Sequence, residues 1–452
     1  MPQPPTIVVI GAVAAGMSAA SQAKRRRKDA QVIVLEQGQD VSYGACGMPY
    51  NIGDAGRSPE DLNVISPRAF REKRGLDLRL GHRVERLDPA ARRVHGRTVE
   101  GEEFTVAYDE LVLATGARPA PPPIPGIELP GVFPLRQLQD ARDIKAWLAE
   151  RAPARAVIVG GSYLGLELAE AMHARGLAVT LVKRSPALLP QLPDSMDALL
   201  RAELEAHGVR LLHGEPVRCV QAAGEGLEVL VGEEILPADL VLLATGYRPN
   251  AEIGLEAGLE AGPAGAIAVD AHGRTSDPHV WAAGDCADAF HGLTGERVWA
   301  PRALRANRTG RIVGGNVLGA AQPIPDSLGT AGLQVFGLEV ATTGFSEVQA
   351  RAAGFDPVTE TIKARSRAHA YPGGRDIHVH LVADKASGRL LGGALVGAEW
   401  AALRIDVVAA ALHHGATVAE LADYDLVYSP PFAPAWDPLL TCANQLAKAV
   451  GN

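Results

Sequence analysis

Two stretches of the chain repeat one pattern, which is a short apolar strand, a glycine turn, a helix and a second apolar strand. The first covers residues 6–36 and the second residues 155–183. A glycine ends the first strand of each unit and another follows five residues later, at Gly11 and Gly16 and at Gly160 and Gly165. The first glycine permits the sharp turn, and the second lets the helix approach the sheet closely.

The N-terminus of each helix presents free N–H groups and a favourable dipole to a pyrophosphate. Two such turns, each between a strand and a helix, predict two dinucleotide sites on parallel sheets. The alternative is a pair of parallel sheets with tight turns and no ligand. The middle position of each turn departs from glycine, with Val13 in the first turn and Ser162 in the second.

The residues that end the second strand of each unit differ in charge. Glu36 ends the first unit, where a carboxylate accepts hydrogen bonds from a ribose 2′-OH. Lys183 and Arg184 end the second unit, where cations attract a 2′-phosphate. We therefore expect FAD at the first site and NADPH, or both nicotinamide cofactors, at the second. The alternative for the two cations is an exposed basic turn.

The 452 residues suffice for several domains. Apolar strands that end in Thr115-Gly116 and in Thr245-Gly246 each close a nucleotide domain, and proline-rich passages at 119–134 and 323–326 read as linkers. A strand pattern at 376–382 and a helix near 401–414 indicate a further α+β domain.

The predicted fold is thus α/β, with two Rossmann-like dinucleotide-binding domains and an α+β C-terminal domain.

Charge and apolar runs narrow the class of protein. The net charge is −8, and the one basic run covers residues 24–28, so nucleic-acid binding is disfavoured. That run reads either as a solvated helix end or as a contact for a phosphorylated substrate. We see no signal peptide and no apolar run long enough for a membrane span, and we expect a cytoplasmic protein. The scattered cysteines predict no metal site.

Of the four cysteines, Cys46 has the most informative position. It follows the first nucleotide unit closely and precedes Pro49, which suits a helix start. A thiol at a helix N-terminus has a lowered pKa, because the dipole favours the thiolate. A thiolate near a flavin can attack a disulfide and later receive electrons. The alternative role is that of a small buried hydrophobe, which we assign to Cys286.

These residues resemble the pyridine nucleotide–disulfide oxidoreductases, in the single-cysteine branch that contains coenzyme A disulfide reductase, NADH oxidase and NADH peroxidase. The resemblance covers essentially the whole chain. Its markers are the segments 11–16, 42–50, 114–116, 160–167, 281–285 and 428–432.

The resemblance implies an FAD-binding domain, residues 1–119 and 250–325, that is split around an NAD(P)-binding domain, residues 120–249. It also implies that the C-terminal domain, residues 326–452, forms a homodimer, and it assigns roles to individual residues. FAD would be bound by Gly11, Ala14, Gly16, Glu36, Val84, Thr115, Gly116, Gly284, Asp285 and Ala303. Val84 and Ala303 would act through backbone groups and Asp285 through the ribitol. NAD(P)H would be bound by Gly160, Ser162, Tyr163, Gly165, Lys183, Arg184 and Gly246.

Coenzyme A would be bound by Ser18, Gln22, Arg25, Ser42 and Arg74. The first three share one face of a helix by their spacing. Tyr371 and Tyr428 would reach the active site from the partner subunit and assist the leaving sulfur. The alternatives are an ordinary helix surface and packing at the subunit interface.

Ala14 decides between the branches, because oxidases and peroxidases of the family carry a histidine there. Alanine cannot move a proton, so we expect a coenzyme A disulfide reductase that forms a mixed disulfide of Cys46 with coenzyme A. A persulfide or polysulfide reductase, an NADH oxidase or peroxidase with a Cys46 sulfenic acid, and a flavin redox sensor are the alternatives. Ala45 and Trp436 stand where asparagine and lysine are expected, and they leave the exact thiol open.

Overall fold

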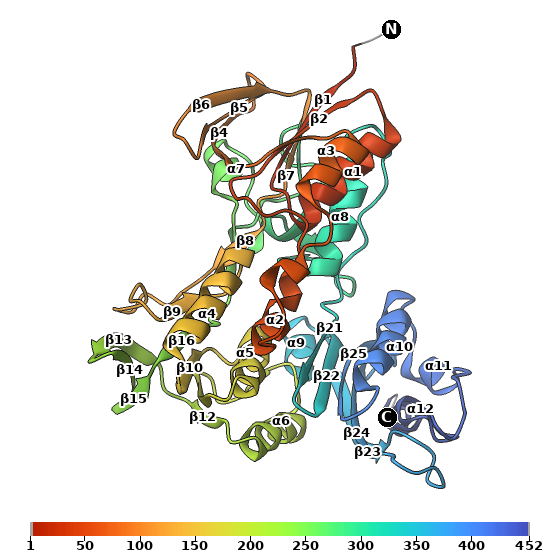
Figure 1. Ribbon diagram of the computed structural model, residues 1–452. Helices are drawn as coiled ribbons and strands as arrows, with labels where there is room; N and C mark the ends of the chain where they lie inside the picture. Colours follow the sequence, from red (N-terminus) through yellow and green to blue (C-terminus); the bar gives the residue numbers. More distant parts are fainter. Residues whose placement is uncertain (1–2, 451–452) are drawn as a thin grey trace.

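The structure, a computed structural model, describes residues 3–450. It contains three five-stranded sheets, and Figure 1 shows three domains built on them, with the first at the top and the C-terminal one at the lower right. Within residues 3–450, no helix combines the length and the apolar character needed to cross a bilayer.

The first domain is built on a parallel sheet with the strand order β18-β7-β1-β2-β3. Its strands are β1 (Thr6–Ile10), β2 (Gln31–Leu35), β3 (Asp77–Arg79), β7 (Glu110–Leu113) and β18 (Val280–Ala282). The central strand β1 is buried from Ile7 to Ile10, as expected for a sheet covered on both faces. Strand β18 follows the second domain in the chain and yet pairs with β7, so the predicted split of the first domain is confirmed.

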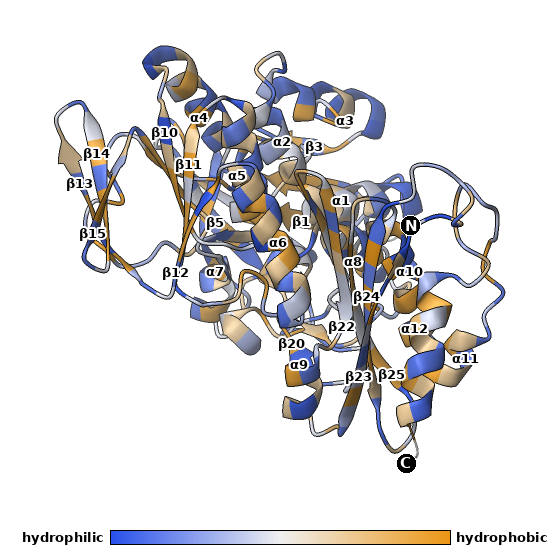
Figure 2. Cartoon of the chain, turned by 90° about the horizontal axis from the view of Figure 1, so that it is seen from below, coloured by the Kyte–Doolittle hydropathy of each residue, from blue (hydrophilic) through white to orange (hydrophobic). Residues whose placement is uncertain are grey.

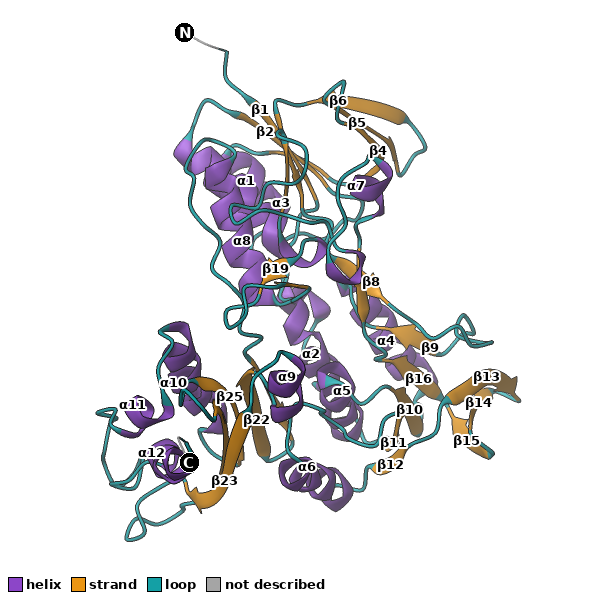
Figure 3. Ribbon diagram, turned by 180° about the vertical axis from the view of Figure 1, so that it is seen from behind, coloured by secondary structure: helices purple, strands orange, loops and turns teal. Residues whose placement is uncertain are grey.

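Two helices from distant parts of the chain cover one face of this sheet side by side, α1 (Ala14–Arg26) and α8 (Ala303–Asn316) (Figure 3). Their close approach depends on two glycines of α8. A Cβ at Gly310 would lie 2.2 Å from the backbone oxygen of Ala15, and one at Gly314 would lie 2.2 Å from that of Ala19. The further elements are α3 (Pro67–Arg74), α7 (Glu252–Glu256) and the antiparallel strands β4 (His82–Asp88), β5 (Arg93–Thr98) and β6 (Glu103–Ala107).

The second domain repeats this design with the strand order β12-β11-β10-β16-β9. Its elements are β9 (Val132–Pro134), α4 (Leu138–Arg151), β10 (Arg155–Val159), α5 (Tyr163–Ala174), β11 (Ala178–Lys183), α6 (Asp194–Ala206), β12 (Arg210–His213), β13 (Val217–Ala223), β14 (Gly226–Val231), β15 (Glu234–Ala238) and β16 (Leu240–Leu243). Strands β8 (Ala117–Pro119) and β17 (Tyr247–Pro249) pair where the chain enters and leaves it.

One predicted linker is partly structured. We expected a linker over 119–134, but its last residues form β9, which pairs with β16 at the edge of the second sheet. Pro134 is tolerated there because an edge strand needs hydrogen bonds on one side only. Proline content alone therefore hid a strand.

The C-terminal domain has an antiparallel sheet with the strand order β21-β22-β25-β24-β23. Its elements are β21 (Ala331–Val335), β22 (Leu338–Gly344), α9 (Glu347–Ala352), β23 (Pro357–Arg365), β24 (Asp376–Asp384), β25 (Leu390–Gly397), α10 (Ala401–His413), α11 (Val418–Ala422) and α12 (Pro438–Leu446). Figure 2 shows α10, α11 and α12 on one side of the sheet and α9 on the other. The predicted α+β character is confirmed.

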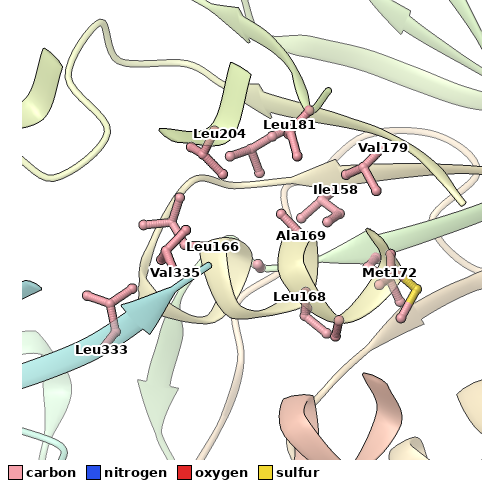
Figure 4. Close-up of a cluster of buried hydrophobic side chains, with 14 of the residues drawn as sticks. Ile158, Leu166, Leu168, Ala169, Met172, Val179, Leu181, Leu204, Leu333 and Val335 are labelled. Atoms are coloured by element: carbon pink, nitrogen blue, oxygen red, sulfur yellow. The ribbon is translucent and has the colours of Figure 1, made fainter. Parts of the chain in front are cut away.

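The core of the second domain continues into the C-terminal sheet. Leu333 and Val335 of β21 belong to the same buried cluster as Ile158 and Leu166 (Figure 4). This shared apolar contact fixes the second and C-terminal domains against each other. The remaining short elements are α2 (Met48–Gly53), β19 (Ala289–Phe290), β20 (Arg297–Val298) and the 3-10 turns η1 (Ala45–Gly47), η2 (Pro59–Leu62), η3 (Pro263–Gly265), η4 (Gly284–Cys286) and η5 (Ala447–Ala449).

Candidate active site

The first glycine turn has the geometry that its sequence predicts. Gly11 has φ +104°, and a Cβ there would lie 2.3 Å from the backbone oxygen of Ala114. A Cβ at Gly16 would lie 1.8 Å from the backbone oxygen of Gly11. Helix α1 starts at Ala14 with no acidic residue in its first turn and no capping side chain. Its first N–H groups are therefore free to bind a phosphate.

Glu36 lies beside this turn. Its Oε2 accepts a hydrogen bond of 2.8 Å from the N–H of Ala12, and its Oε1 accepts one of 2.8 Å from the N–H of Gly38. Burial raises the pKa of Glu36, and these backbone donors oppose the shift. The free helix N-terminus and the fixed carboxylate fit the adenosine diphosphate part of FAD.

The other residues expected at FAD surround the carboxyl end of the same sheet. Gly116 has φ +72° and Gly284 has φ +81°, and Thr115 donates a hydrogen bond of 2.5 Å to the backbone oxygen of Asn250. Ala303 begins α8, which also lacks a capping side chain, so its N–H group is free. Val84 lies at an irregularity in the register of β4.

Asp285 has a cationic partner that the sequence did not reveal. Nη2 of Arg136 donates a hydrogen bond of 2.9 Å to its Oδ2, while no hydrogen bond from residues 3–450 reaches its Oδ1. Nε of Arg136 also donates to the backbone oxygen of Ala117 at 2.9 Å, and the guanidinium lies 5.3 Å from the ring centre of Tyr247. Asp285 thus keeps one carboxylate oxygen that can accept a further hydrogen bond. Arg136 was missed because it follows the passage that reads as a linker.

Cys46 lies in the turn η1, immediately before α2, and Pro49 stands in the first turn of that helix as predicted. All four cysteines are free thiols, and Cys46 alone among them is exposed. Cys286 is buried and its thiol points to the backbone oxygens of Leu113 and Ala283, in agreement with its predicted packing role. In Figure 1, α2 lies at the junction of the domains.

The predicted lowering of the Cys46 pKa is wrong for this chain. Partial burial is the largest cause, and it raises the pKa of Cys46. The carboxylates of Glu167 and Asp285 raise this pKa further, while Arg136 lowers it. Cys46 is exposed as a residue, yet enough protein lies around its thiol to desolvate it in part. The sulfur also lies within η1 rather than at the start of α2, and α2 has only six residues, so its dipole is weak.

Glu167 is a second residue whose position the sequence did not explain. It lies on α5 and accepts a hydrogen bond of 3.1 Å from the phenol of Tyr50 on α2. Burial raises the pKa of Glu167 to about 7. A carboxyl group that changes its charge near neutral pH therefore lies close to Cys46 and between two domains.

The second glycine turn has the same geometry as the first. Gly160 has φ +111°, and a Cβ there would lie 2.3 Å from the backbone oxygen of Ala244; one at Gly165 would lie 1.8 Å from that of Gly160. Ser162 precedes α5 without capping it, and its Oγ donates instead to the backbone oxygen of Ala244 at 3.1 Å. The N-terminus of α5 is free for a phosphate, and Gly246 has open space where a Cβ would stand.

The other residues expected at the NAD(P)H site differ in their burial and in their hydrogen-bond partners. The Tyr163 hydroxyl lies 3.3 Å from that of Thr342 in the C-terminal sheet. Lys183 turns inward, where Nζ donates to the backbone oxygens of Gly161, at 3.2 Å, and Leu188, and burial lowers its pKa. Arg184 is exposed. The two cations expected to meet a 2′-phosphate are therefore not equivalent.

The residues expected to bind coenzyme A lie around the exposed side of α1. Oγ of Ser18 donates to Oδ1 of Asn307 on α8 at 3.1 Å, and Nε of Arg25 donates to the backbone oxygen of Ser21 at 3.3 Å. Gln22 lies between them on the same helix face. Arg74 comes from α3 and donates to Oγ of Ser21 at 2.8 Å.

Ser42 has a backbone φ of +51° just before the turn that carries Cys46. Of the residues expected to bind coenzyme A, Arg25 and Arg74 both bond to Ser21, so these two cations lie close together.

Tyr371 and Tyr428 lie in the C-terminal domain, with exposed fractions of 36% and 55%. Residues 3–450 of this single chain contain no hydrogen bond between either tyrosine and the turn that carries Cys46. The two loops do contact each other, because the N–H of Ala368 donates to the backbone oxygen of Pro430 at 3.2 Å. Trp436 lies nearby and is 67% exposed.

The family models identify this fold. Residues 5–310 match the pyridine nucleotide-disulphide oxidoreductase model, and residues 330–439 match the dimerisation domain of the same family. The chain belongs to the pyridine nucleotide-disulphide oxidoreductases. It is an oxidoreductase with two dinucleotide-binding domains and a dimerisation domain, as the sequence predicted.

Named relatives cover nearly the whole chain. It is 38% identical over 441 residues to the NAD(P)H coenzyme A polysulfide/persulfide reductase of Pyrococcus horikoshii, covering 97% of this chain and 98% of that protein. Among solved structures, the reduced CoADR-RHD of Bacillus anthracis is similar, with a TM-score of 0.95 and 31% identity over 99% of this chain and 80% of that one. The NAD-dependent persulfide reductase of A. fulgidus has a TM-score of 0.95 and 36% identity over 98% of this chain and 83% of that one.

Proposed function

We propose that the protein is an FAD-dependent NAD(P)H:disulfide oxidoreductase that reduces coenzyme A disulfide through a mixed disulfide of Cys46 with coenzyme A. One observation carries the proposal. The single exposed cysteine lies beside Arg136 and Asp285, which border the expected flavin site, and beside Glu167, which belongs to the helix of the second nucleotide turn.

Each ligand has a set of residues to hold it. The first glycine turn and Glu36 would hold the adenosine diphosphate part of FAD, and Asp285 would hold its ribitol. The second turn would hold NAD(P)H, with Arg184 toward a 2′-phosphate. Ser18, Gln22, Arg25, Ser42 and Arg74 would bind coenzyme A. Bound FAD supplies a two-electron carrier between the nicotinamide and the sulfur.

The chemistry of the chain centres on the sulfur of Cys46. The Cys46 thiolate attacks one sulfur of coenzyme A disulfide, so the Cys46–coenzyme A disulfide forms and the substrate S–S bond breaks. The first coenzyme A leaves as a thiolate and takes a proton. Two electrons that come from NAD(P)H then cleave the mixed disulfide, which restores the Cys46 thiolate and releases the second coenzyme A.

The leaving thiolate needs a proton donor, and the partner subunit of a homodimer would supply it. Tyr371 and Tyr428 are exposed on the dimerisation domain, and a phenol donates a hydrogen bond or proton to a thiolate. Arg136 would favour the Cys46 thiolate, while Glu167 opposes it when ionised. We expect the enzyme to work in the cytoplasm, with no membrane or nucleic-acid partner.

A coenzyme A persulfide reductase is the second candidate, and the names of the Pyrococcus horikoshii and A. fulgidus relatives favour it. The same Cys46 would attack the inner sulfur of a persulfide and release hydrogen sulfide. An NADH oxidase or peroxidase is less well supported, because Ala14 offers no proton donor beside Cys46.

Mass spectrometry of the purified, non-reduced protein tests the proposal. We expect an adduct of coenzyme A mass that is absent from Cys46→Ser and retained in Cys219→Ser, whose half-buried thiol lies in the second domain. Cys46→Ser should bind FAD and fail to reduce coenzyme A disulfide. Disulfide turnover by Cys46→Ser would refute the scheme. A sulfenic acid at Cys46 would favour the oxidase branch, and sulfide release from coenzyme A persulfide would favour the second candidate.

A further inference from the structure

Trp400 has an unusual backbone conformation at the start of α10. Its φ is 59° and its ψ is 15°, which is the left-handed region that a bulky aromatic residue rarely adopts. Two hydrogen bonds to the carboxylate of Glu339 stabilise this turn. Oε1 accepts from the N–H of Trp400 at 3.2 Å, and Oε2 accepts from the N–H of Ala402 at 2.9 Å. Such strain persists where the surroundings impose it, and it is common at functional sites.

Two guanidinium groups lie against the indole of Trp400. The Cζ of Arg367 is 5.1 Å from its ring centre, and the Cζ of Arg404 is 5.9 Å from it. Both distances are within the range of cation–π contacts. Arg367 lies in the loop after β23 and Arg404 lies on α10, so the indole joins a loop to a helix.

Each guanidinium also reaches one of the tyrosine loops. Arg367 lies 5.7 Å from the ring centre of Tyr371, and its Nη1 donates to the backbone oxygen of Pro372 at 3.3 Å. Nη2 of Arg404 donates to the backbone oxygen of Phe432 at 2.9 Å. The Phe432 ring lies 6.0 Å from that of Trp400.

Each of the two guanidinium groups beside Trp400 is paired with a carboxylate. Oε2 of Glu399 accepts from Nε of Arg367 at 3.0 Å and from Oγ of Ser366 at 2.7 Å. Oδ2 of Asp437 accepts from Nε of Arg404 at 3.0 Å, and this pair is nearly buried, with side-chain exposures of 11% for Arg404 and 9% for Asp437. Each cation is therefore fixed by a carboxylate and a backbone oxygen, which leaves it little freedom to move.

We propose that Trp400, with its flanking cations Arg367 and Arg404, is a positioning residue that holds the loops of Tyr371 and Tyr428 in one arrangement. In that arrangement both phenols meet the departing coenzyme A thiolate at Cys46 of the other subunit. The inference rests on the proposed function. Loss of the indole releases both loops while the phenols themselves remain, so it affects the rate of the thiol-releasing step rather than the binding of either cofactor.

Trp400→Gly tests the role of the indole most directly, because glycine adopts the left-handed conformation without strain and the change removes only the side chain. We expect kcat for coenzyme A disulfide to fall by about tenfold to a hundredfold, the range for a displaced catalytic group. The rate of FAD reduction by NADPH in single-turnover experiments should not change. The dimer, measured by gel filtration, should persist.

The matched variants are Tyr428→Phe, Trp400→Phe and Val348→Ala. Trp400→Gly should add little to the loss caused by replacing Tyr371 and Tyr428 together with phenylalanine, because both changes remove the same function. Trp400→Phe keeps an aromatic ring for the two cations and should recover most of kcat. Val348 is exposed on α9 in the same domain, and its truncation should leave kcat unchanged.

Two outcomes overturn the inference. One is an unchanged kcat in Trp400→Gly when Tyr428→Phe is slow, which leaves the proposed function intact. The other is a full additional loss when Trp400→Gly is combined with the replacement of both tyrosines. If Trp400→Gly fails to fold, Arg367→Lys replaces it, since lysine keeps the charge but loses the planar stacking. A normal kcat in Arg367→Lys would likewise overturn the inference. Turnover by Cys46→Ser would instead overturn the proposed function itself.

Discussion

The phenol of Tyr50 donates a hydrogen bond of 3.1 Å to Oε1 of Glu167 and thereby joins α2 of the first domain to α5 of the second. Burial between the two helices raises the pKa of Glu167 from 4.5 to about 7, while the bond from Tyr50 lowers it. The contact between the domains therefore changes its charge near neutral pH, close to Cys46.

The first prediction concerns stability and Glu167. Between pH 4.5 and about 7 the folded chain retains a proton on Glu167 that the unfolded chain has lost. The stabilisation from this group is fully present below pH 4.5 and is lost as the pH rises through about 7. Glu167→Gln has no such titration, so its Tm relative to the natural protein should rise with pH across this window, as measured by calorimetry.

Tyr50→Phe provides the control, because it removes the hydrogen bond that lowers the pKa of Glu167. Its pH-dependent loss of stability should therefore continue to a higher pH than in the natural protein. A Tm difference between Glu167→Gln and the natural protein that is constant with pH would contradict the assignment.

The second prediction concerns the thiol of Cys46. Arg136 lowers the pKa of Cys46, and the carboxylate of Glu167 raises it. Arg136→Met should therefore shift the alkylation of the reduced enzyme by iodoacetamide to higher pH, and Glu167→Gln should shift it to lower pH. The rate is followed by the mass of the labelled protein, and Cys46→Ser sets the background. Shifts of the same sign in both variants would contradict the electrostatic account.

The third prediction separates the two nucleotide sites. An added Cβ at Gly16 or at Gly165 would lie 1.8 Å from a backbone oxygen, so alanine at either position displaces the helix from its turn. Gly16→Ala should be purified without FAD. Gly165→Ala should retain FAD and raise KM for NAD(P)H by about tenfold or more, as expected when phosphate contacts are lost.

Gly56→Ala is the control for both glycines, because the nearest atom to its Cβ would be 3.4 Å away, on the side chain of Asp54. It should retain FAD and a normal KM. The assignment of the two sites would be wrong if Gly165→Ala lost FAD while Gly16→Ala retained it.

The sequence was sufficient for features that depend on local backbone geometry. The two strand–turn–helix units were predicted closely, and their helices end at Arg26 and Ala174. Strand periodicity and glycine turns act within one segment, so a single sequence carries them.

Features that depend on distant segments were not predictable. Arg136 and Asp285 are 149 positions apart, and no local pattern pairs them. The pKa of Cys46 was predicted with the wrong sign, because a helix start suggests a lowered pKa while burial and Glu167 act from other elements. Charge and burial at a site are set by tertiary packing, which the order of residues along the chain does not display.

The last prediction concerns the choice between NADPH and NADH. Lys183 is engaged with the backbone oxygens of Gly161 and Leu188, whereas Arg184 is exposed at the end of β11. Arg184 is therefore the cation that can pair with a 2′-phosphate. Arg184→Gln should lower kcat/KM for NADPH by about tenfold, the effect of a lost charged hydrogen bond, and should scarcely change that for NADH.

Lys183→Met should behave differently, because the ammonium of Lys183 supports the glycine turn that both cofactors use. We expect it to lower kcat/KM for NADPH and NADH by similar factors, measured by steady-state kinetics at one ionic strength. If Lys183→Met affected NADPH alone, Lys183 would have to turn outward when the cofactor binds. The ratio of the two kcat/KM values thus distinguishes a lysine that supports the turn from one that reads the phosphate.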